Sequence, residues 1–229
     1  MNKYPHKNND QNKLYSASDI IVNDGGESVR KRPGMYFGDV DNGNALYGLF
    51  DQAMDVSLRE QMGQKANRIR VTLHSDRSLE VADNGPPWPI GQVDIDREKV
   101  TRELMLVLRR GFGVITAVSR WATATLYQDG KEYFCRTVQN DRIDVPLVYR
   151  GAAPVTEAGV FAEGTTFRFL PSSDIFPSIE FSSMLIEHML HSKAAQNPGL
   201  SIQFENLTHP YSQLTMIGPF AEAETDKAA

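Results

Sequence analysis

Apolar positions recur along the chain with two different periods. From Asn44 to Met62 they fall at spacings of three and four residues, which predicts an amphipathic helix with Asn44 as its N-cap. In RIRVTLHSDRSLEVAD (68–83), apolar and polar residues instead alternate on both sides of the turn at Ser75–Ser78. This alternation predicts a β-hairpin whose second strand ends at Asp83.

Other periodic segments complete the set of predicted elements. Helices are expected over 96–110 and 181–197, and a short helix is expected after the glycines of RGFGV (110–114). WATATLYQDGKEYFCRTV (121–138) predicts a hairpin that turns at Asp129–Gly130. Two further strands are expected at GTTFRFL (164–170) and LSIQFE (200–205). Helices mixed among strands predict an α+β fold, a two-layer α/β sandwich.

Composition narrows the class of protein. The chain has 229 residues, 41% of them hydrophobic, enough for one substantial core. A net charge of -5 disfavours a surface that neutralises phosphates, so no direct DNA binding is expected. Cys135 is the only cysteine and no apolar run approaches the roughly 20 residues of a membrane span, so we expect a cytoplasmic protein with no membrane contact.

The two ends of the chain differ from its middle. Residues 1–14 are polar and rich in Asn and Lys, and are expected to form a mobile arm. Residues 213–229 lead into a small-residue, acidic sequence and are expected to form a flexible tail. With no internal repeat or long linker between them, a single domain is predicted from 15 to 212.

Two stretches carry polar residues whose chemistry has more than one interpretation. In VADNGPPWPIG (81–91), Asp-Asn-Gly is ordinary turn chemistry, so the residues alone favour a turn-capping role for Asp83. Arg109 and Arg110 precede Gly111 and Gly113, where a helix start and two guanidinium groups favour an anion. The alternative is that the arginines end the preceding helix and Gly111 caps it, and both interpretations stay open.

One segment matches a known family closely. VRKRPGMY (29–36), within 14–39, resembles the start of the ATPase domain of the DNA gyrase B protein and of its topoisomerase IV counterpart. The likeness continues in order through LFDQAMDVSL (49–58), VADNGPPWPIG (81–91) and EGTTFRFLPSSDIF (163–176). The resemblance implies the GHKL, or Bergerat, fold: a mixed sheet with helices on one face and an ATP pocket between them.

The resemblance also implies roles for individual residues. Asp83 matches the acid that accepts a hydrogen bond from the adenine amine, Gly85 belongs to the same Asp-x-Gly-x-Gly box, and Thr165 matches the threonine beside that contact. Tyr15 matches a tyrosine on an arm that reaches the nucleotide of a neighbouring protomer. The implied cofactor is therefore ATP or ADP, and the implied assembly is a homodimer or a heteromer with a gyrase-type subunit.

This chain departs from the family where hydrolysis takes place. When LYGLFDQAMD (46–55) is aligned with the family helix through Asp51, Ala53 and Asp55, the catalytic glutamate falls on Gly48 and the magnesium-binding asparagine on Gln52. The extra methylene of Gln52 displaces its oxygen, so we expect magnesium binding to be weakened. The second glycine of the box is Pro87, the arginine that pairs with the acid at Asp55 is Pro86, and the glycine-rich phosphate lid is cut to LRRGFGV (108–114). Arg110, Gly111 and Gly113 are what remains to hold phosphate.

These departures predict a degenerate gyrase-B-like ATPase domain. We expect weak or no adenine-nucleotide binding, no ATP hydrolysis, and action through protein contacts. One alternative is a slow ATPase in which Asp51 or another acid replaces the missing base and Arg109 and Arg110 hold the phosphates. Another is a pocket reassigned to a different small ligand, with Trp88 and the neighbouring prolines as an apolar wall.

Overall fold

A computed structural model describes residues 25–58, 66–86, 112–139, 142–153, 163–208 and 212–218. The helices are α1 (Gly25–Lys31), α2 (Gly34–Phe37), α3 (Asn44–Leu58), α5 (Gly113–Ala117) and α6 (Ser183–Gln196). The strands are β1 (Arg68–Leu73), β2 (Leu79–Asp83), β3 (Ser119–Gln128), β4 (Lys131–Val138), β5 (Arg142–Ala152), β6 (Gly164–Pro171), β7 (Ser201–Asn206) and β8 (Gln213–Ile217). The helix predicted over 96–110 lies outside the described residues.

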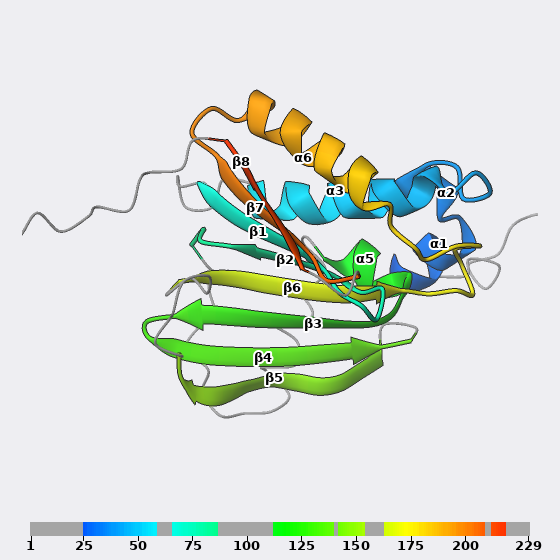
Figure 1. Cartoon of the computed structure of the whole chain (residues 1–229). Coiled ribbons are helices and arrows are strands. Elements are labelled where there is room, and N and C mark those ends of the chain that lie inside the picture. The colour runs from blue at the N-terminus through cyan, green and yellow to red at the C-terminus, as the bar shows by residue number, and fades with distance from the viewer. Residues whose placement is uncertain are drawn as a thin grey trace, which may run out of the picture.

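All eight strands belong to one mixed sheet, in the order β5-β4-β3-β6-β2-β1-β7-β8 (Figure 1). Neighbouring strands pair antiparallel except β1 and β7, which pair parallel. The parallel pair arises because the chain returns through α6 before it enters β7, and a parallel neighbour requires such a crossover. The predicted α+β class, a mixed sheet with helices on one face, is confirmed.

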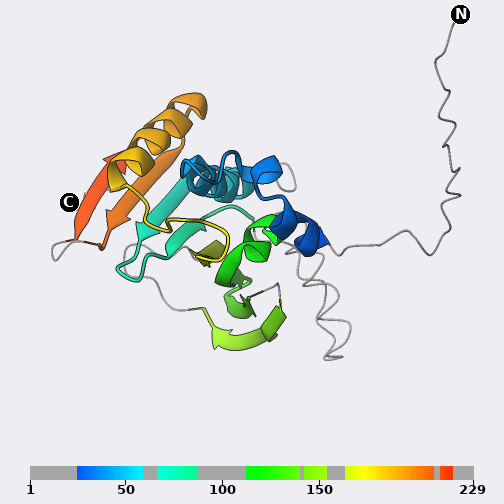
Figure 2. The same ribbon diagram turned by 90° about the vertical axis from the view of Figure 1, so that its right-hand side faces the viewer.

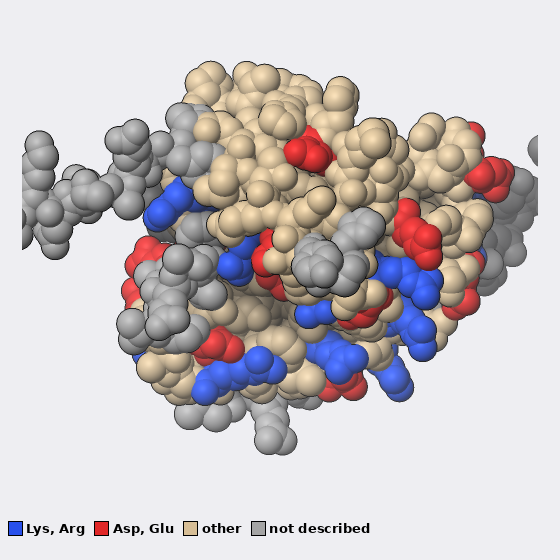
Figure 3. Space-filling model, viewed as in Figure 1, with Lys and Arg blue, Asp and Glu red and all other residues tan. Residues whose placement is uncertain are grey.

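The described helices cover one face of the sheet, and none of them lies on the other, which we call the open face (Figures 1 and 2). Along β3 the side chains alternate: Ala122, Ala124 and Leu126 are buried, whereas Trp121 and Thr123 are partly exposed. This period of two follows from the pleat of a strand, so one side faces the helices and the other faces solvent. On the open face, Lys and Arg side chains are interspersed with Asp and Glu (Figure 3).

The core lies between the sheet and α3. The apolar face of α3 is fully buried against β2 and β6, as its three- and four-residue spacing predicts. Phe112, just before α5, stacks on Phe167 of β6 with ring centroids 3.8 Å apart and an interplanar angle of 19°. This stack fixes the start of α5 against the middle of the sheet.

Two strands extend the sheet beyond the sequence prediction. β5 is not among the predicted strands, and it forms an edge strand that pairs with β4. β8 pairs with β7 from Gln213 to Ile217, so the first part of the tail expected at 213–229 is a strand of the sheet. The turn at Asp129–Gly130 is present, with positive φ at both residues, as a tight hairpin turn requires. None of the described helices is long and apolar enough to cross a membrane.

Candidate functional site

Asp83 is a buried carboxylate at the end of β2, with an exposed fraction of 7%. It accepts hydrogen bonds from the backbone N–H of Gly85 at 3.0 Å, from the backbone N–H of Thr165, and from the side chain of Ser57 on α3. Burial raises the pKa of Asp83 to about 6, because the loss of solvation outweighs the three hydrogen bonds. At neutral pH the group is therefore mainly ionised, and a carboxylate with about four acceptor positions keeps one for a ligand.

The backbone around Asp83 is held by glycine and by Asn84. Gly164, at φ 141°, faces Asp83 in β6, and a Cβ there would lie only 1.9 Å from the backbone oxygen of Asp83. Asn84 accepts the N–H groups of Asn67 and Arg68 at 3.1 and 2.9 Å, which ties this turn to the start of β1. The turn-capping role predicted for Asp83 from its sequence is present, because Asp83 accepts the backbone N–H of Gly85. The same carboxylate also accepts a hydrogen bond from Ser57 of α3.

Gly48 lies where α3 meets the end of α2. A Cβ at Gly48 would be 2.1 Å from the backbone oxygen of Phe37 and 2.9 Å from its carbonyl carbon. One turn further along α3, the Nε2 of Gln52 donates to the backbone oxygen of Tyr36 at 2.6 Å. Both residues expected to mark the positions of the base and the magnesium ligand are therefore in contact with the backbone of α2.

The two carboxylates of α3 share one cation. Asp51 and Asp55, one turn apart, lie 2.8 and 2.6 Å from the Nζ of Lys193 on α6. Burial lowers the pKa of Lys193, but its hydrogen bonds to both carboxylates outweigh this and the net pKa is raised. Asp55, expected to lack the family's arginine, thus has a different partner.

The remaining predicted site residues are only partly within the described part of the chain. Tyr15, Arg110 and Gly111 lie outside it, as do Arg109, Pro87 and Trp88. Gly113 is the first residue of α5. Among the described residues no group of three or more His, Cys, Asp or Glu could hold a metal ion.

Two residues of this region are not among those predicted from the sequence. Ser57 is a buried polar residue on the otherwise apolar face of α3, and that exception to the pattern is a signal for it. Lys193 carries no such signal, because 138 residues separate it from Asp55. Its role follows only from the packing of α6 beside α3.

The chain was compared with known proteins. No family model matches it. The DNA gyrase B protein of Rickettsia typhi is 34% identical over 209 residues, which are 82% of this chain and 25% of the relative. The DNA gyrase B protein of Thermotoga maritima is 34% identical over 217 residues, 84% of this chain and 32% of the relative. The chain thus spans about a quarter to a third of these relatives.

A solved structure extends the comparison to the fold. The 43K ATPase domain of Thermus thermophilus gyrase B, in complex with an aminocoumarin, aligns with a TM-score of 0.68 and 29% identity over 83% of this chain and 50% of that one. The sheet order, the helical face and the buried Asp83 therefore define a GHKL ATPase-domain fold. Within that class, the chain is homologous to the B protein of DNA gyrase.

Proposed function

We propose that this chain is a gyrase-B-like GHKL module that does not hydrolyse ATP, binds adenine nucleotide weakly or not at all, and acts through protein contacts. The observation that carries the proposal is the pairing of Asp51 and Asp55, the only carboxylates of α3, with Lys193. One oxygen of each carboxylate holds the ammonium of Lys193, at 2.8 and 2.6 Å, so a water at that oxygen would have to displace the ammonium. This pairing also argues against a slow ATPase that uses Asp51 as its base.

The adenine side of the site fits a nucleotide better than the phosphate side does. Asp83 keeps an acceptor position beside Thr165, which suits the amine of adenine. On α3, Gly48, at the position of the family's base, supplies no acid, and neither does Gln52, at the position of the magnesium ligand. Removal of a general base typically lowers the rate by about 10²- to 10⁴-fold.

Magnesium does not fit the described residues. The amide of Gln52 directs its NH2 group to Tyr36, and one oxygen of each α3 carboxylate holds the ammonium of Lys193. Magnesium prefers oxygen ligands in near-ideal octahedral geometry, usually including carboxylates. No metal-dependent step is therefore assigned to this chain.

We propose that the chain acts through protein contacts. On the homology to gyrase B, we propose a cytoplasmic homodimer or a heteromer with a gyrase-type subunit. Co-elution of a gyrase-type protein with this chain would support the heteromer, and a concentration-dependent mass of twice the monomer would support the homodimer.

Calorimetry and a turnover assay on the full chain test the loss of hydrolysis. ADP and a non-hydrolysable ATP analogue are titrated with and without magnesium, and phosphate release is followed at saturating ATP. We expect phosphate release equal to that of buffer, and any heat of binding to be independent of magnesium and lost in Asp83→Asn. Asp174→Asn, a change of an acid away from the site, is the matched control. Magnesium-dependent turnover that disappears in Asp83→Asn but not in Asp174→Asn would overturn the proposal.

A further inference from the structure

A cavity of about 390 Å³ lies at the end of the sheet opposite Asp83. Its walls come from the β1–β2 turn, the start of β3, the end of β6 and the 172–182 segment that follows β6. β6 runs from Thr165, beside Asp83, to Leu170 at the cavity, and five residues of strand span about 17 Å. The cavity is thus separate from the nucleotide-like site, and its volume falls within the range of about 300–1,000 Å³ typical of ligand pockets.

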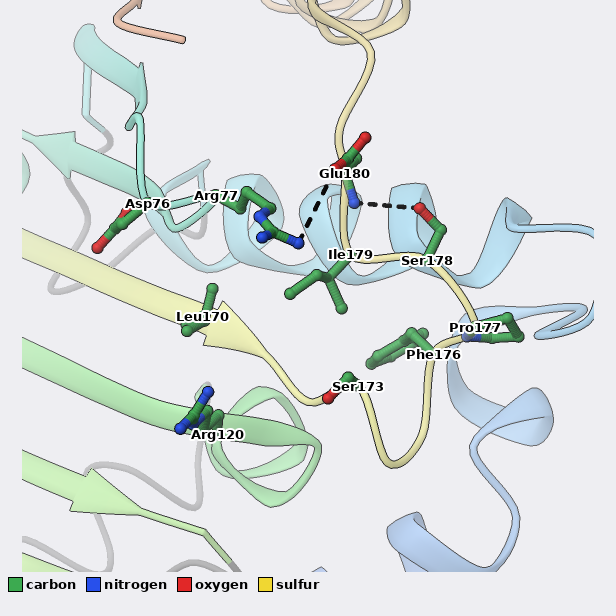
Figure 4. A pocket seen from close by; sticks show the side chains of 10 residues that line it. All are labelled: Asp76, Arg77, Arg120, Leu170, Ser173, Phe176, Pro177, Ser178, Ile179 and Glu180. Atoms are coloured by element: carbon green, nitrogen blue, oxygen red, sulfur yellow. Dashed lines mark hydrogen bonds and ion pairs between the residues drawn. The ribbon is translucent and has the colours of Figure 1, made fainter.

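The inner wall of the cavity is apolar. Leu170 lies on one side, between two arginines, and Ile179 and Phe176 lie on the other side (Figure 4). Phe176 is almost fully buried and packs edge-on against Phe37 with ring centroids 6.4 Å apart, so this wall is anchored in the core. An apolar body of a ligand would be buried against these side chains.

The first arginine, Arg77, occupies a backbone position that normally selects glycine. Arg77 lies in the β1–β2 turn at φ 69°. Its backbone N–H donates to the carbonyl of His74 and closes that turn. Left-handed backbone is unfavourable for a residue with a side chain, and glycine avoids this cost. An arginine at this position therefore carries a conformational cost, and it lines the cavity.

The second arginine, Arg120, is the extra residue of a β-bulge. Ser119 pairs with Pro171 and Trp121 with Leu170, so Arg120 has no partner residue in β6. A bulge redirects the side chain of its extra residue, and here that side chain lines the cavity. Arg120 is exposed and forms no ion pair with any described residue.

The charges at the cavity leave one cation in excess. Asp76 is engaged, because it accepts from Arg168 at 2.9 Å and from Ser78. Arg77 lies 3.8 Å from Glu180, a long pair between side chains that are 56% and 72% exposed. Arg120 is therefore the uncompensated charge, which favours one negative charge on a ligand and disfavours two.

We propose that this cavity binds a small monoanion, an apolar group that carries one carboxylate. The carboxylate lies between the guanidinium groups of Arg77 and Arg120, and the apolar group lies against Leu170, Phe176 and Ile179. Guanidinium and carboxylate match as charge-assisted, bidentate partners, which gives the site its preference for a planar anion. The same chemistry is offered by a free apolar acid and by the C-terminus of a peptide that ends in an apolar residue.

Calorimetry on the full chain, with 4-phenylbutyrate as the probe, tests this site. The variants are Arg120→Gln and Arg77→Gly, and Arg142→Gln, an exposed arginine at the start of β5, is the matched control. We expect saturable binding that weakens about tenfold or more in each of the two cavity variants and is unchanged in the control. Arg77→Gly should unfold at a urea concentration no lower than the parent chain, because glycine suits the backbone at that position.

Three further ligands sharpen the result. The neutral 4-phenylbutyramide should bind at least tenfold more weakly, and phenyl phosphate should bind no better than 4-phenylbutyrate. N-acetyl-alanyl-phenylalanine, which presents a peptide carboxyl group, assigns the source: tighter binding than the free acid indicates a peptide terminus, and weaker binding indicates a small acid. Absence of saturable binding, equal binding of the amide, tighter binding of the phosphate, or unchanged affinity in both variants would overturn the proposal. ADP titrations of the same variants keep this outcome separate from that of the nucleotide-like site.

Discussion

Substitution of Gly48 by alanine tests whether this helix-interior glycine is required by packing. The added Cβ would stand 2.1 Å from the backbone oxygen of Phe37, far inside the normal contact distance. The Phe37 atoms are backbone and a Cβ is fixed rigidly to the backbone of α3, so α2 and α3 would have to move apart, and overpacking of this kind costs about 1–3 kcal/mol. The same shift would weaken the 2.6 Å hydrogen bond from Gln52 to Tyr36, worth about 1 kcal/mol.

An opposing term must be subtracted. Alanine is favoured over glycine inside a helix by about 1 kcal/mol, so the intrinsic effect of the change is stabilising. The steric and hydrogen-bond terms are larger, and we expect a net loss of about 2 kcal/mol in the free energy of unfolding. With a urea dependence of about 2 kcal/mol per molar, the unfolding midpoint should fall by about 1 M.

Urea unfolding followed by circular dichroism measures this midpoint. Gly34→Ala is the matched control, because Gly34 also lies in a helix and has no positive φ. A Cβ added at Gly34 would have no neighbouring atom within 4 Å. The control should unfold within about 0.5 kcal/mol of the parent chain. A Gly48→Ala chain as stable as the parent, or more stable, would refute the reasoning, since it would show that position 48 has room for a side chain.

Three further changes probe the contacts around the site. Lys193→Met should lower the free energy of unfolding by about 1 kcal/mol, because it leaves Asp51 and Asp55 unpaired. Folding raises the pKa of Lys193, so its contribution to stability is present below about pH 10.5 and is lost at higher pH. The urea midpoints of variant and parent should therefore converge above that pH. Asp83 binds its proton more tightly in the folded chain than in the unfolded chain, so the free energy of unfolding should fall by about 3 kcal/mol as pH rises from about 4 to 6. This part of the pH profile should be absent in Asp83→Asn. An identical profile in the variant would contradict the raised pKa of Asp83. Gly164→Ala should destabilise the chain more than Gly48→Ala in the same urea assay, because it combines a 1.9 Å contact with φ 141°; a smaller loss would contradict the close approach of β6 to Asp83.

The elements that the sequence predicts are those set by local alternation. The hairpin over 68–83 and the strand at 164–170 are present because alternate residues face the helices and the solvent, a pattern visible without any partner strand. β5 escapes prediction because it is an edge strand that contains Pro146 and Gly151, residues that argue against a central strand. β8 escapes prediction because its assignment depends on pairing with β7.

The site divides in the same way. Asp83, Gly85 and Thr165 are predicted from the resemblance, and the structure brings them together at one end of β2 and β6. Helix propensity alone indicates that glycine is unfavourable at position 48. The structure shows instead that glycine is required there, because the backbone of Phe37 leaves no room for a Cβ. Such a requirement comes from packing between α2 and α3, so propensity could not reveal it.

The contacts of α3 favour the proposed absence of hydrolysis over the simple loss of one acid. If this helix had only lost an acid, a single substitution would restore the chemistry. Instead, Gly48 and Gln52 contact the backbone of α2, and Lys193 of α6 bridges both carboxylates. A glutamate at position 48 would collide with Phe37, and one at position 52 would place its charge beside the carbonyl of Tyr36. Under the proposed function, a catalytic acid on this helix would therefore require coordinated changes in three helices, and α3 serves as a packing element.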